Sequence, residues 1–165
     1  MITRFATDED NAELVRVINL AYRVEDFFVN GNRTNPDDIR RRMAIPESGF
    51  IVIEDEEKGV LAGAVWVDLH GTRGHFGMLS VDPAYQGKGL SRTLINAVED
   101  HCRSHGCTDL DLEVVNLRLE LPPYYAKFGF APSGITEFND TEKLTREVHL
   151  IVMTKPLFTA AVNAG

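Results

Sequence analysis

The fold is decided by the segment Met78-Leu79-Ser80-Val81-Asp82-Pro83-Ala84-Tyr85-Gln86-Gly87-Lys88-Gly89-Leu90-Ser91. It predicts a strand, a tight glycine turn and the first turn of a long helix, whose apolar side continues through Leu94, Ile95, Val98 and Cys102. Glycines lack a Cβ, so the backbone can turn sharply and bring its N–H groups close to an anion. The positive end of the helix dipole adds to this attraction. The segment therefore predicts an anion site between a strand and a helix.

Two common nucleotide-binding motifs contain similar residues, and neither fits this segment. The P-loop needs a glycine, four residues and then Gly-Lys-Ser/Thr. Here Asp82 occupies the first glycine position and Gly89 follows Lys88. The dinucleotide fingerprint needs three spaced glycines after the first strand, and this segment has two, in mid-chain. The spacing therefore argues against a phosphoryl-transfer or dinucleotide-binding protein.

Length and composition narrow the class of protein. The chain has 165 residues, which suits one domain, and its 25% charged and 44% hydrophobic residues are ordinary for a globular protein. A net charge of −8 argues against a nucleic-acid partner. No apolar run approaches the ~20 residues of a membrane helix, and the first residues show no signal-peptide core. We therefore expect a cytoplasmic monomer or homodimer without a membrane partner.

The order of predicted elements alternates between strands and helices. Apolar runs and alternation predict strands at residues 2–6, 50–54, 60–69, 75–81, 109–115, 130–132 and 147–154. Helical spacing, prolines and acids predict helices at 11–24, 35–43, 90–106 and 122–128. The strands on either side of the long helix then form a parallel β-α-β crossover. Residues 158–165 are expected to be a small-residue tail.

The segment Gln86-Gly87-Lys88-Gly89-Leu90-Ser91 resembles the Gln/Arg-x-x-Gly-x-Gly/Ala signature of the GNAT superfamily of N-acetyltransferases, with Ser91 in place of the final Gly/Ala. Asn116 and the segment Tyr125-Ala126-Lys127-Phe128-Gly129-Phe130 resemble the second motif of that family. The resemblance implies a single GNAT domain over residues 1–157. It further implies a mixed α/β fold, with a mostly antiparallel sheet of six to seven strands, one parallel crossover and about four helices.

The resemblance implies acetyl-coenzyme A as cosubstrate and no metal. Backbone amides of the glycine segment would hold the pyrophosphate, and Leu79 and Val81 would present backbone groups to the pantetheine arm and the thioester carbonyl. The predicted coenzyme site comprises Leu79, Ser80, Val81, Gln86, Gly87, Lys88, Gly89, Leu90, Ser91, Arg92, Asn116 and Tyr125.

Two catalytic residues are predicted, a general acid and a base. Tyr125 matches the family's general acid, which stabilises the leaving thiolate, with Tyr124 as the structural alternative. The spacing from Asn116 to Tyr125 is longer than is common in the family, which could shift the phenol. The acid that some members carry early in the strand before the glycine loop is absent. His75 lies there and has a suitable unperturbed pKa for a base.

Other bases stay open at this point: Glu25, Glu113, His149 or a chain of water molecules. A dense set of possible zinc ligands, His101, Cys102, His105 and Cys107, also stands near the end of the long helix. The alternative is an ordinary helix end at Gly106, with polar histidines outside and cysteines tucked inward.

The acceptor site is predicted in the loop between the first two helices and at the helix end before it. Its residues are Tyr22, Glu25, Phe27, Phe28 and Arg33. Acids beside aromatic rings suit a cationic amine, which the net charge also favours. Arg33 could instead bind a carboxylate and favour an amino-acid-like acceptor. A loop with one core phenylalanine and otherwise solvated residues is the structural alternative.

The resemblance thus predicts direct transfer of an acetyl group from acetyl-coenzyme A to a primary amine of a small molecule or peptide, in a ternary complex. The alternative is a catalytically idle acyl-coenzyme A-binding module, which would have no need of Tyr125.

Overall fold

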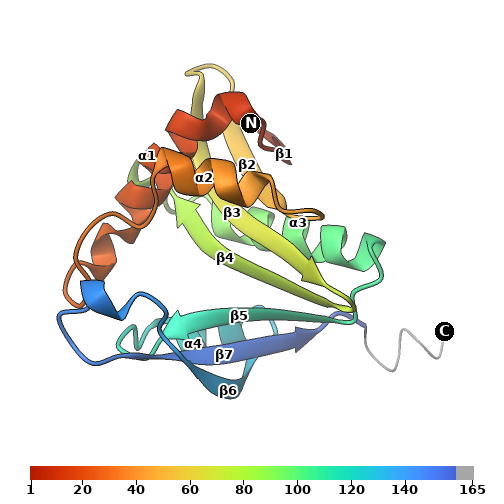
Figure 1. Ribbon diagram of the computed structural model, residues 1–165. Coiled ribbons are helices and arrows are strands. Elements are labelled where there is room, and N and C mark those ends of the chain that lie inside the picture. Colours follow the sequence, from red (N-terminus) through yellow and green to blue (C-terminus); the bar gives the residue numbers. More distant parts are fainter. Residues whose placement is uncertain (159–165) are drawn as a thin grey trace.

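A seven-stranded sheet in the order β1-β2-β3-β4-β5-β7-β6 forms the centre of the computed structural model, which describes residues 1–158 (Figure 1). The strands are β1 (Ile2–Phe5), β2 (Gly49–Asp55), β3 (Val60–His70), β4 (Arg73–Val81), β5 (Asp109–Val115), β6 (Ala131–Glu137) and β7 (His149–Pro156). The helices are α1 (Asn11–Tyr22), α2 (Pro36–Met43), α3 (Leu90–Ser104) and α4 (Leu121–Ala126). All neighbouring strands are antiparallel except β4 and β5, so the predicted GNAT topology with one parallel β4-α3-β5 crossover is confirmed.

Two predicted elements differ from the observed ones in their bounds. The predicted helix 11–24 ends at Tyr22 and continues as a short 3₁₀ turn, Arg23–Glu25. The predicted strand 130–132 is the longer β6, although Pro132 and Gly134 are poor strand residues. A register shift between these two residues accommodates them at the sheet edge. Most of the predicted tail, residues 159–165, lies outside the described residues.

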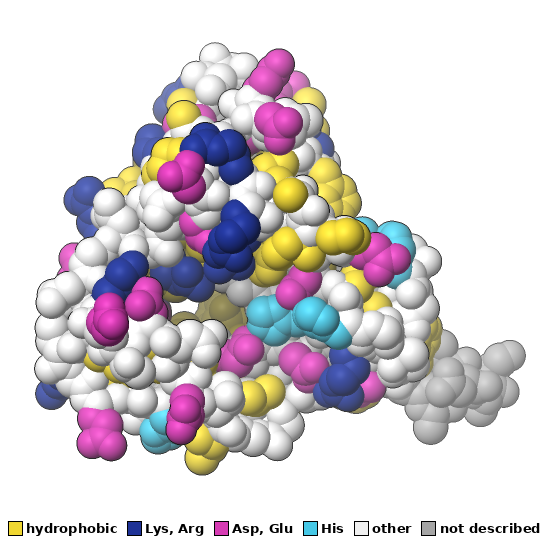
Figure 2. Space-filling view, viewed as in Figure 1, with side chains coloured by type: hydrophobic (Ala, Val, Ile, Leu, Met, Phe, Trp, Pro, Cys, Tyr) yellow, Lys and Arg dark blue, Asp and Glu magenta, His cyan; other side chains and the backbone are white. Residues whose placement is uncertain are grey.

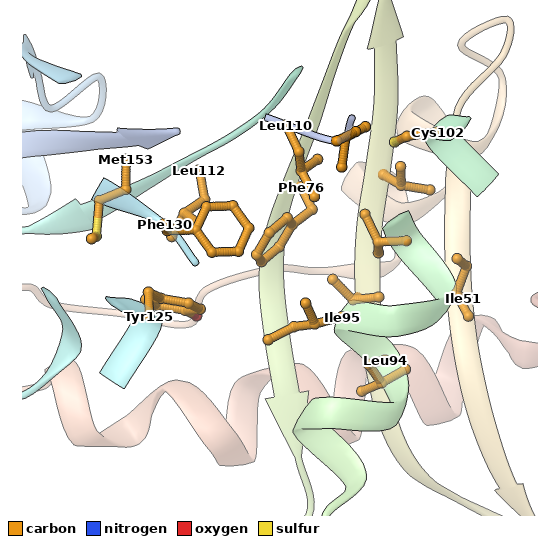
Figure 3. Packing of buried hydrophobic residues seen from close by; sticks show 14 of the residues in the cluster. Ile51, Phe76, Leu94, Ile95, Cys102, Leu110, Leu112, Tyr125, Phe130 and Met153 are labelled. Carbon is orange, nitrogen blue, oxygen red and sulfur yellow. The ribbon is translucent and has the colours of Figure 1, made fainter. Parts of the chain in front are cut away.

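Helices cover the sheet on both faces and create two apolar clusters. On one face α1 and α2 pack over Phe50, Trp66 and Met78. On the other face α3 and α4 cover a larger cluster that includes Phe76 and Phe130. Figure 3 shows Phe76 of β4, Leu112 of β5, Tyr125 of α4 and Phe130, which precedes β6, packed together in this second cluster. None of the helices in residues 1–158 is long and apolar enough to cross a membrane.

A β-bulge at Met78 changes which face the residues of β4 occupy. Its φ of 54° is unusual for a residue with a side chain, and the register with β3 shifts at this point. Phe76 consequently packs on the α3 face and Met78 on the α1 face, although an unbroken strand would place both on the same face. Leu79, next to Met78, packs against the α3 cluster.

The parallel ladder between β4 and β5 is short. It joins Arg73, Gly74 and His75 to Asp109, Leu110 and Asp111, and then ends. Figure 1 shows the two strands together at one end and diverging towards the other. β5 stays paired with β7 along its whole length, so the gap opens between the two halves of the sheet.

The glycine loop at the open end is tied to α1. Asp82 accepts a hydrogen bond from the N–H of Ala84 at 2.9 Å and pairs with the guanidinium of Arg16 at 2.8 Å. Arg16 also donates to the backbone oxygen of Leu61 and to Glu13 on its own helix. These contacts fix the start of the loop against both α1 and β3.

The four possible zinc ligands near the end of α3 do not gather into one site. Cys102 and Cys107 are fully buried, and burial raises the pKa of the Cys102 thiol to about 12. His101 packs against the ring of Phe5 at 5.0 Å. Within residues 1–158, no group of three or more His, Cys, Asp or Glu side chains is arranged to hold a metal ion. The rings of His101 and His105 lie 4.3 Å apart, while both cysteines belong to the buried cluster on the sheet face that α3 covers.

Candidate active site

The glycine loop presents bare backbone towards the gap in the sheet. Gly87 and Gly89 both adopt left-handed conformations, with φ of 80° and 75°, and Gly89 is the N-cap of α3. A side chain would be strained at either position, although no neighbouring atom lies within 4 Å of the place a Cβ would take. The open space above both glycines leaves room for a ligand to approach the main chain.

The N–H groups of residues 87–92 are available to such a ligand. Within residues 1–158 none of them donates a hydrogen bond to the protein, whereas the N–H of Thr93 begins the helical pattern by bonding to the oxygen of Gly89. Consecutive free donors at a helix N-terminus bind anions. The positive groups of Lys88 and Arg92 lie nearby, each over an aromatic ring, at 5.3 Å from Tyr85 and 4.6 Å from Phe128.

The strand that enters this loop supplies a second set of backbone groups. Beyond His75 the main chain of β4 has no ladder with β5, so Leu79 and Val81 have no strand partner on that side. The hydroxyl of the buried Ser80 donates to the oxygen of Met78 at 2.9 Å, which supports the bulge. Leu79, Ser80 and Val81 therefore lie at the edge of the gap, and their contact with the coenzyme stays a prediction.

Tyr125 lies on α4 at the other side of the gap. Its ring is nearly buried and packs edge-on against Phe76 and Phe130, at 6.1 Å from each. Burial strongly raises the pKa of its phenol, with a further contribution from Tyr22, so the hydroxyl keeps its proton at neutral pH. Tyr124 packs instead against Phe128 at 5.3 Å. The long spacing from Asn116 has thus not turned Tyr125 away from the core.

The loop after β5 contributes two polar residues. The amide oxygen of Asn116 accepts the N–H of His149 at 2.9 Å, and the N–H of Asn116 donates back to the oxygen of His149 at 3.0 Å. Asn116 thus ties β5 to β7, and its contact with the coenzyme stays a prediction. Arg118, which the sequence analysis missed, pairs with Glu25 at 3.0 Å. An arginine in the loop after a central strand was the available signal, since functional residues gather in such loops.

The ion pair with Arg118 changes the interpretation of Glu25. This carboxylate was predicted to hold an acceptor ammonium group, but it is buried and engaged by a guanidinium. Burial raises the pKa of the Glu25 carboxyl, and Arg118 opposes that rise. The pair joins the turn after α1 to the loop after β5, across the mouth of the gap. Glu25 is therefore a bridging residue rather than a free acid.

The two phenylalanines of the α1–α2 loop have opposite environments. Phe28 is fully buried and Phe27 is 46% exposed, with their rings edge to face at 4.9 Å. The prediction that Phe28 lines an open acceptor wall is therefore wrong, because its side chain is the core of the loop. The backbone oxygen of Phe28 accepts a hydrogen bond from the N–H of Thr145 at 2.8 Å. The backbone N–H of Asn30 donates to the backbone oxygen of Lys143 at 2.8 Å. The loop is thus held by the segment between β6 and β7.

Tyr22 and Arg33 come together as a pair. The guanidinium of Arg33 lies 5.3 Å from the centre of the Tyr22 ring. Both line a cavity of about 370 Å³ under the α1–α2 loop. Burial raises the pKa of the Tyr22 phenol, while Arg33 opposes that rise. The structure therefore places these two predicted residues in one cavity.

His75 is held between two carboxylates at the closed end of the gap. Its Nδ1 lies 2.7 Å from Asp68 of β3 and its Nε2 lies 2.5 Å from Glu113 of β5. Burial of the ring opposes charging, but the two carboxylates outweigh it and raise the pKa of His75 to about 10. An imidazole that is already protonated, with both nitrogens engaged, is poorly suited to accept a proton. This arrangement argues against the predicted base and makes His75 a charged clamp across β3, β4 and β5.

The clamp lies in an open groove of about 800 Å³ on the sheet face. Figure 2 shows His and acidic side chains gathered in this region. The groove is lined by Asp68, His70, Arg73, His75, Asp109, Asp111, Glu113, Ser133, Val152 and Thr154. Its charges are largely paired internally, since Arg73 bonds twice to Asp111 at 2.8 Å.

Residues 17–130 match the sequence profile described as the Acetyltransferase (GNAT) family. The chain belongs to this family. The mycothiol acetyltransferase of Propionibacterium freudenreichii subsp. shermanii is 35% identical over 131 residues, which cover 75% of this chain and 41% of that protein. The chain spans about half the length of the curated relatives that it matches.

Solved structures of GNAT proteins share this fold. The ribosomal-protein-S18-alanine N-acetyltransferase of Escherichia coli superposes with a TM-score of 0.75 at 17% identity, covering 96% of this chain and 95% of that one. The protein yncA of Salmonella typhimurium, solved with its cofactor acetyl-CoA, gives a TM-score of 0.71 at 21% identity, with the same coverage of 96% and 95%. At these identities the likeness shows the fold alone.

The His75 clamp predicts how stability depends on pH in this GNAT domain. Between about pH 6.5 and pH 10 the folded protein keeps the His75 proton and the unfolded chain releases it, so the free energy of unfolding should fall as pH rises. His75→Gln should remove this slope below about pH 9, above which the buried Cys102 thiol, with its pKa raised from 9.0 to about 12, adds a slope of the same sign. Urea unfolding at several pH values measures it.

His149→Gln is the matched control for this measurement. His149 is exposed on β7, and within residues 1–158 its ring has no ion-pair partner. The control should keep the slope of the unmodified protein. A slope equal in the His75 variant and the unmodified protein would show that His75 is not held as a cation.

Proposed function

We propose that this GNAT domain transfers the acetyl group of acetyl-coenzyme A to a primary amine within a ternary complex. The observation that carries the proposal is the row of free N–H groups of residues 87–92 at the mouth of the gap between β4 and β5. Free donors at a helix N-terminus fit a pyrophosphate, and the unpaired edge of β4 fits an extended amide-containing arm. Coenzyme A has both a pyrophosphate and an amide-containing arm, so it matches these two features together.

The coenzyme supplies an activated acyl thioester, and the residues of this chain orient it. In the proposed complex the amides of the glycine loop hold the pyrophosphate, with Lys88 and Arg92 adding positive charge. The main chain of Leu79 and Val81 bonds the pantetheine arm, and one of these N–H groups polarises the thioester carbonyl. Asn116 lies at the end of β5, on the opposite side of the same gap.

The amine attacks the thioester carbon, so that a C–N bond forms and the C–S bond breaks. Tyr125 donates a hydrogen bond to the leaving sulfur and can transfer its proton there, because its phenol is neutral at pH 7. The proton lost by the amine goes to water, since His75 is charged. Both cysteines, Cys102 of α3 and Cys107 after it, are buried, so neither thiol is exposed to receive the acetyl group as an intermediate. Direct transfer to the amine therefore suits this chain.

The acceptor is proposed only as a primary amine. The name of one relative refers to mycothiol, and the name of a structural neighbour refers to an alanine of ribosomal protein S18. Both a small molecule and a peptide N-terminus therefore stay within the proposal.

The glycine loop gives the first test. Gly89→Asp places a negative side chain where the pyrophosphate should bind, so affinity for acetyl-coenzyme A should fall by about tenfold or more, which is about 1.4 kcal/mol. Isothermal titration calorimetry measures it. Gly71→Asp is the control, because Gly71 has a similar φ of 62° and equal open space in the β3–β4 turn. Equal affinity in a folded Gly89 variant would place the coenzyme elsewhere.

Tyr125 gives the second test. Tyr125→Phe keeps the ring packing and removes only the hydroxyl, so kcat should fall by roughly 10²-fold while coenzyme binding stays nearly constant. Tyr124→Phe is the matched control and should retain most activity. Steady-state release of coenzyme A with an amine panel measures both. Binding of the coenzyme without any acetyl transfer would favour the idle binding module.

A further inference from the structure

The cavity under the α1–α2 loop has an unusual concentration of donors. Its walls come from the end of α1 and from the loop itself: Asn19, Tyr22, Arg23, Asp26, Val29, Asn30, Gly31, Asn32 and Arg33. The lining thus includes two arginines, three asparagines and one aspartate, and the amide of Asn19 is engaged by the main chain of Thr34.

The two arginines of this cavity differ from most others in the chain. Eight of the twelve arginines form ion pairs within residues 1–158, namely Arg4, Arg16, Arg40, Arg41, Arg42, Arg73, Arg103 and Arg118. Within the same residues neither Arg23 nor Arg33 has a carboxylate within ion-pair distance, although Asp26 lines the same cavity. Both charges are therefore free to bind an external anion.

The cavity shares Tyr22 with the surroundings of the proposed site of transfer. Tyr22 is one of its walls, and the Tyr22 phenol is close enough to Tyr125 to contribute to the raised pKa of that residue. Glu25, in the turn directly after Tyr22, would repel an anion, but Arg118 pairs with it at 3.0 Å. A ligand can thus lie with one end near Arg33 and the other near Tyr125.

The walls are held by contacts of their own. The amide of Asn19 bonds twice to the main chain of Thr34, accepting its N–H at 2.9 Å and donating to its oxygen at 3.0 Å. Asn30 and Phe28 bond to the β6–β7 segment. A guanidinium on such a fixed loop binds an anion with a small loss of conformational entropy.

We infer that this cavity binds an anionic group, a carboxylate or a phosphate, carried by the same molecule as the amine that is acetylated. The inference rests on the proposed function for the amine end alone. A volume of about 370 Å³ lies at the lower end of ligand pockets and suits part of a small acceptor. Planar guanidinium groups bind both anions through paired N–H donors. The acceptor is therefore not a simple cation, contrary to what net charge and Glu25 indicated from the sequence.

Matched ligand pairs test the inference. L-phenylalanine is compared with 2-phenylethylamine, and glucosamine 6-phosphate with glucosamine, so that each pair differs in one anionic group. Calorimetry in the presence of coenzyme A measures binding without turnover. In at least one pair the anionic member should bind about tenfold or more tightly. The pair that responds distinguishes a carboxylate from a phosphate.

Arg33→Gln should reduce that preference to within about threefold. Arg40→Gln, on the exposed side of α2 and outside the cavity, removes the same charge and should leave the preference intact. Circular dichroism confirms that both variants fold. The inference is overturned if no anionic member binds better than its partner, or if the preference survives in the Arg33 variant.

Acetyl transfer to the same four amines separates this result from the proposed function. If neutral and anionic members are acetylated with equal kcat/KM, the transferase proposal holds and the anion site is wrong. If the anionic member binds selectively but no amine is acetylated, the anion site holds and the transferase proposal fails.

Discussion

The parallel ladder between β4 and β5 joins only three residues of each strand, and the proposed active site depends on where it ends. Beyond His75 and Asp111 the two strands diverge, so the main chain of β4 faces a gap instead of a neighbouring strand. The bulge at Met78 lies on this unpaired stretch and reverses which side chains face α3. A continuous sheet would have buried the same backbone groups in hydrogen bonds and left no place for an extended ligand.

Side-chain contacts then hold the two halves of the sheet at a fixed separation. At the closed end the imidazolium of His75 joins Asp68 and Glu113, which lie on the strands on either side of β4. Just beyond the ladder Phe76 and Tyr125 belong to one apolar cluster, so that α4 packs across the gap. Across its mouth Arg118 and Glu25 connect the loop after β5 to the turn after α1. The gap therefore has firm walls before any ligand binds, which lowers the entropy cost of binding.

Charge is distributed unevenly over this acidic chain. The net charge is −8, yet the glycine loop has Lys88 and Arg92 beside its free N–H groups, and the α1–α2 cavity has Arg23 and Arg33. Many of the acids outside these sites pair with arginines, as Asp82 does with Arg16. In the proposed anion site, binding depends on the few charges that lack partners and not on the overall charge.

The sequence predicted those features that local chemistry determines. The strand, glycine turn and amphipathic helix around Gly87 and Gly89 follow from neighbouring residues, and the parallel crossover follows from their order. Contacts between distant residues could not be predicted in the same way. Nothing near Glu25 in the chain indicates that Arg118 neutralises it, and nothing near His75 indicates Glu113 as its partner. Phe27 and Phe28 are chemically equivalent in sequence, and only the packing of the loop decides which is buried.

The free amides of residues 87–92 and the unpaired edge of β4 are proposed to form the coenzyme site. Titration of ¹⁵N-labelled protein with coenzyme A, followed by amide NMR, tests this proposal most directly. We expect the amide resonances of residues 87–92 and of Leu79 and Val81 to shift most, while those of β1 and of Gly71 in the β3–β4 turn stay in place. Absence of shifts, or shifts confined to residues outside the glycine loop and β4, would contradict the account.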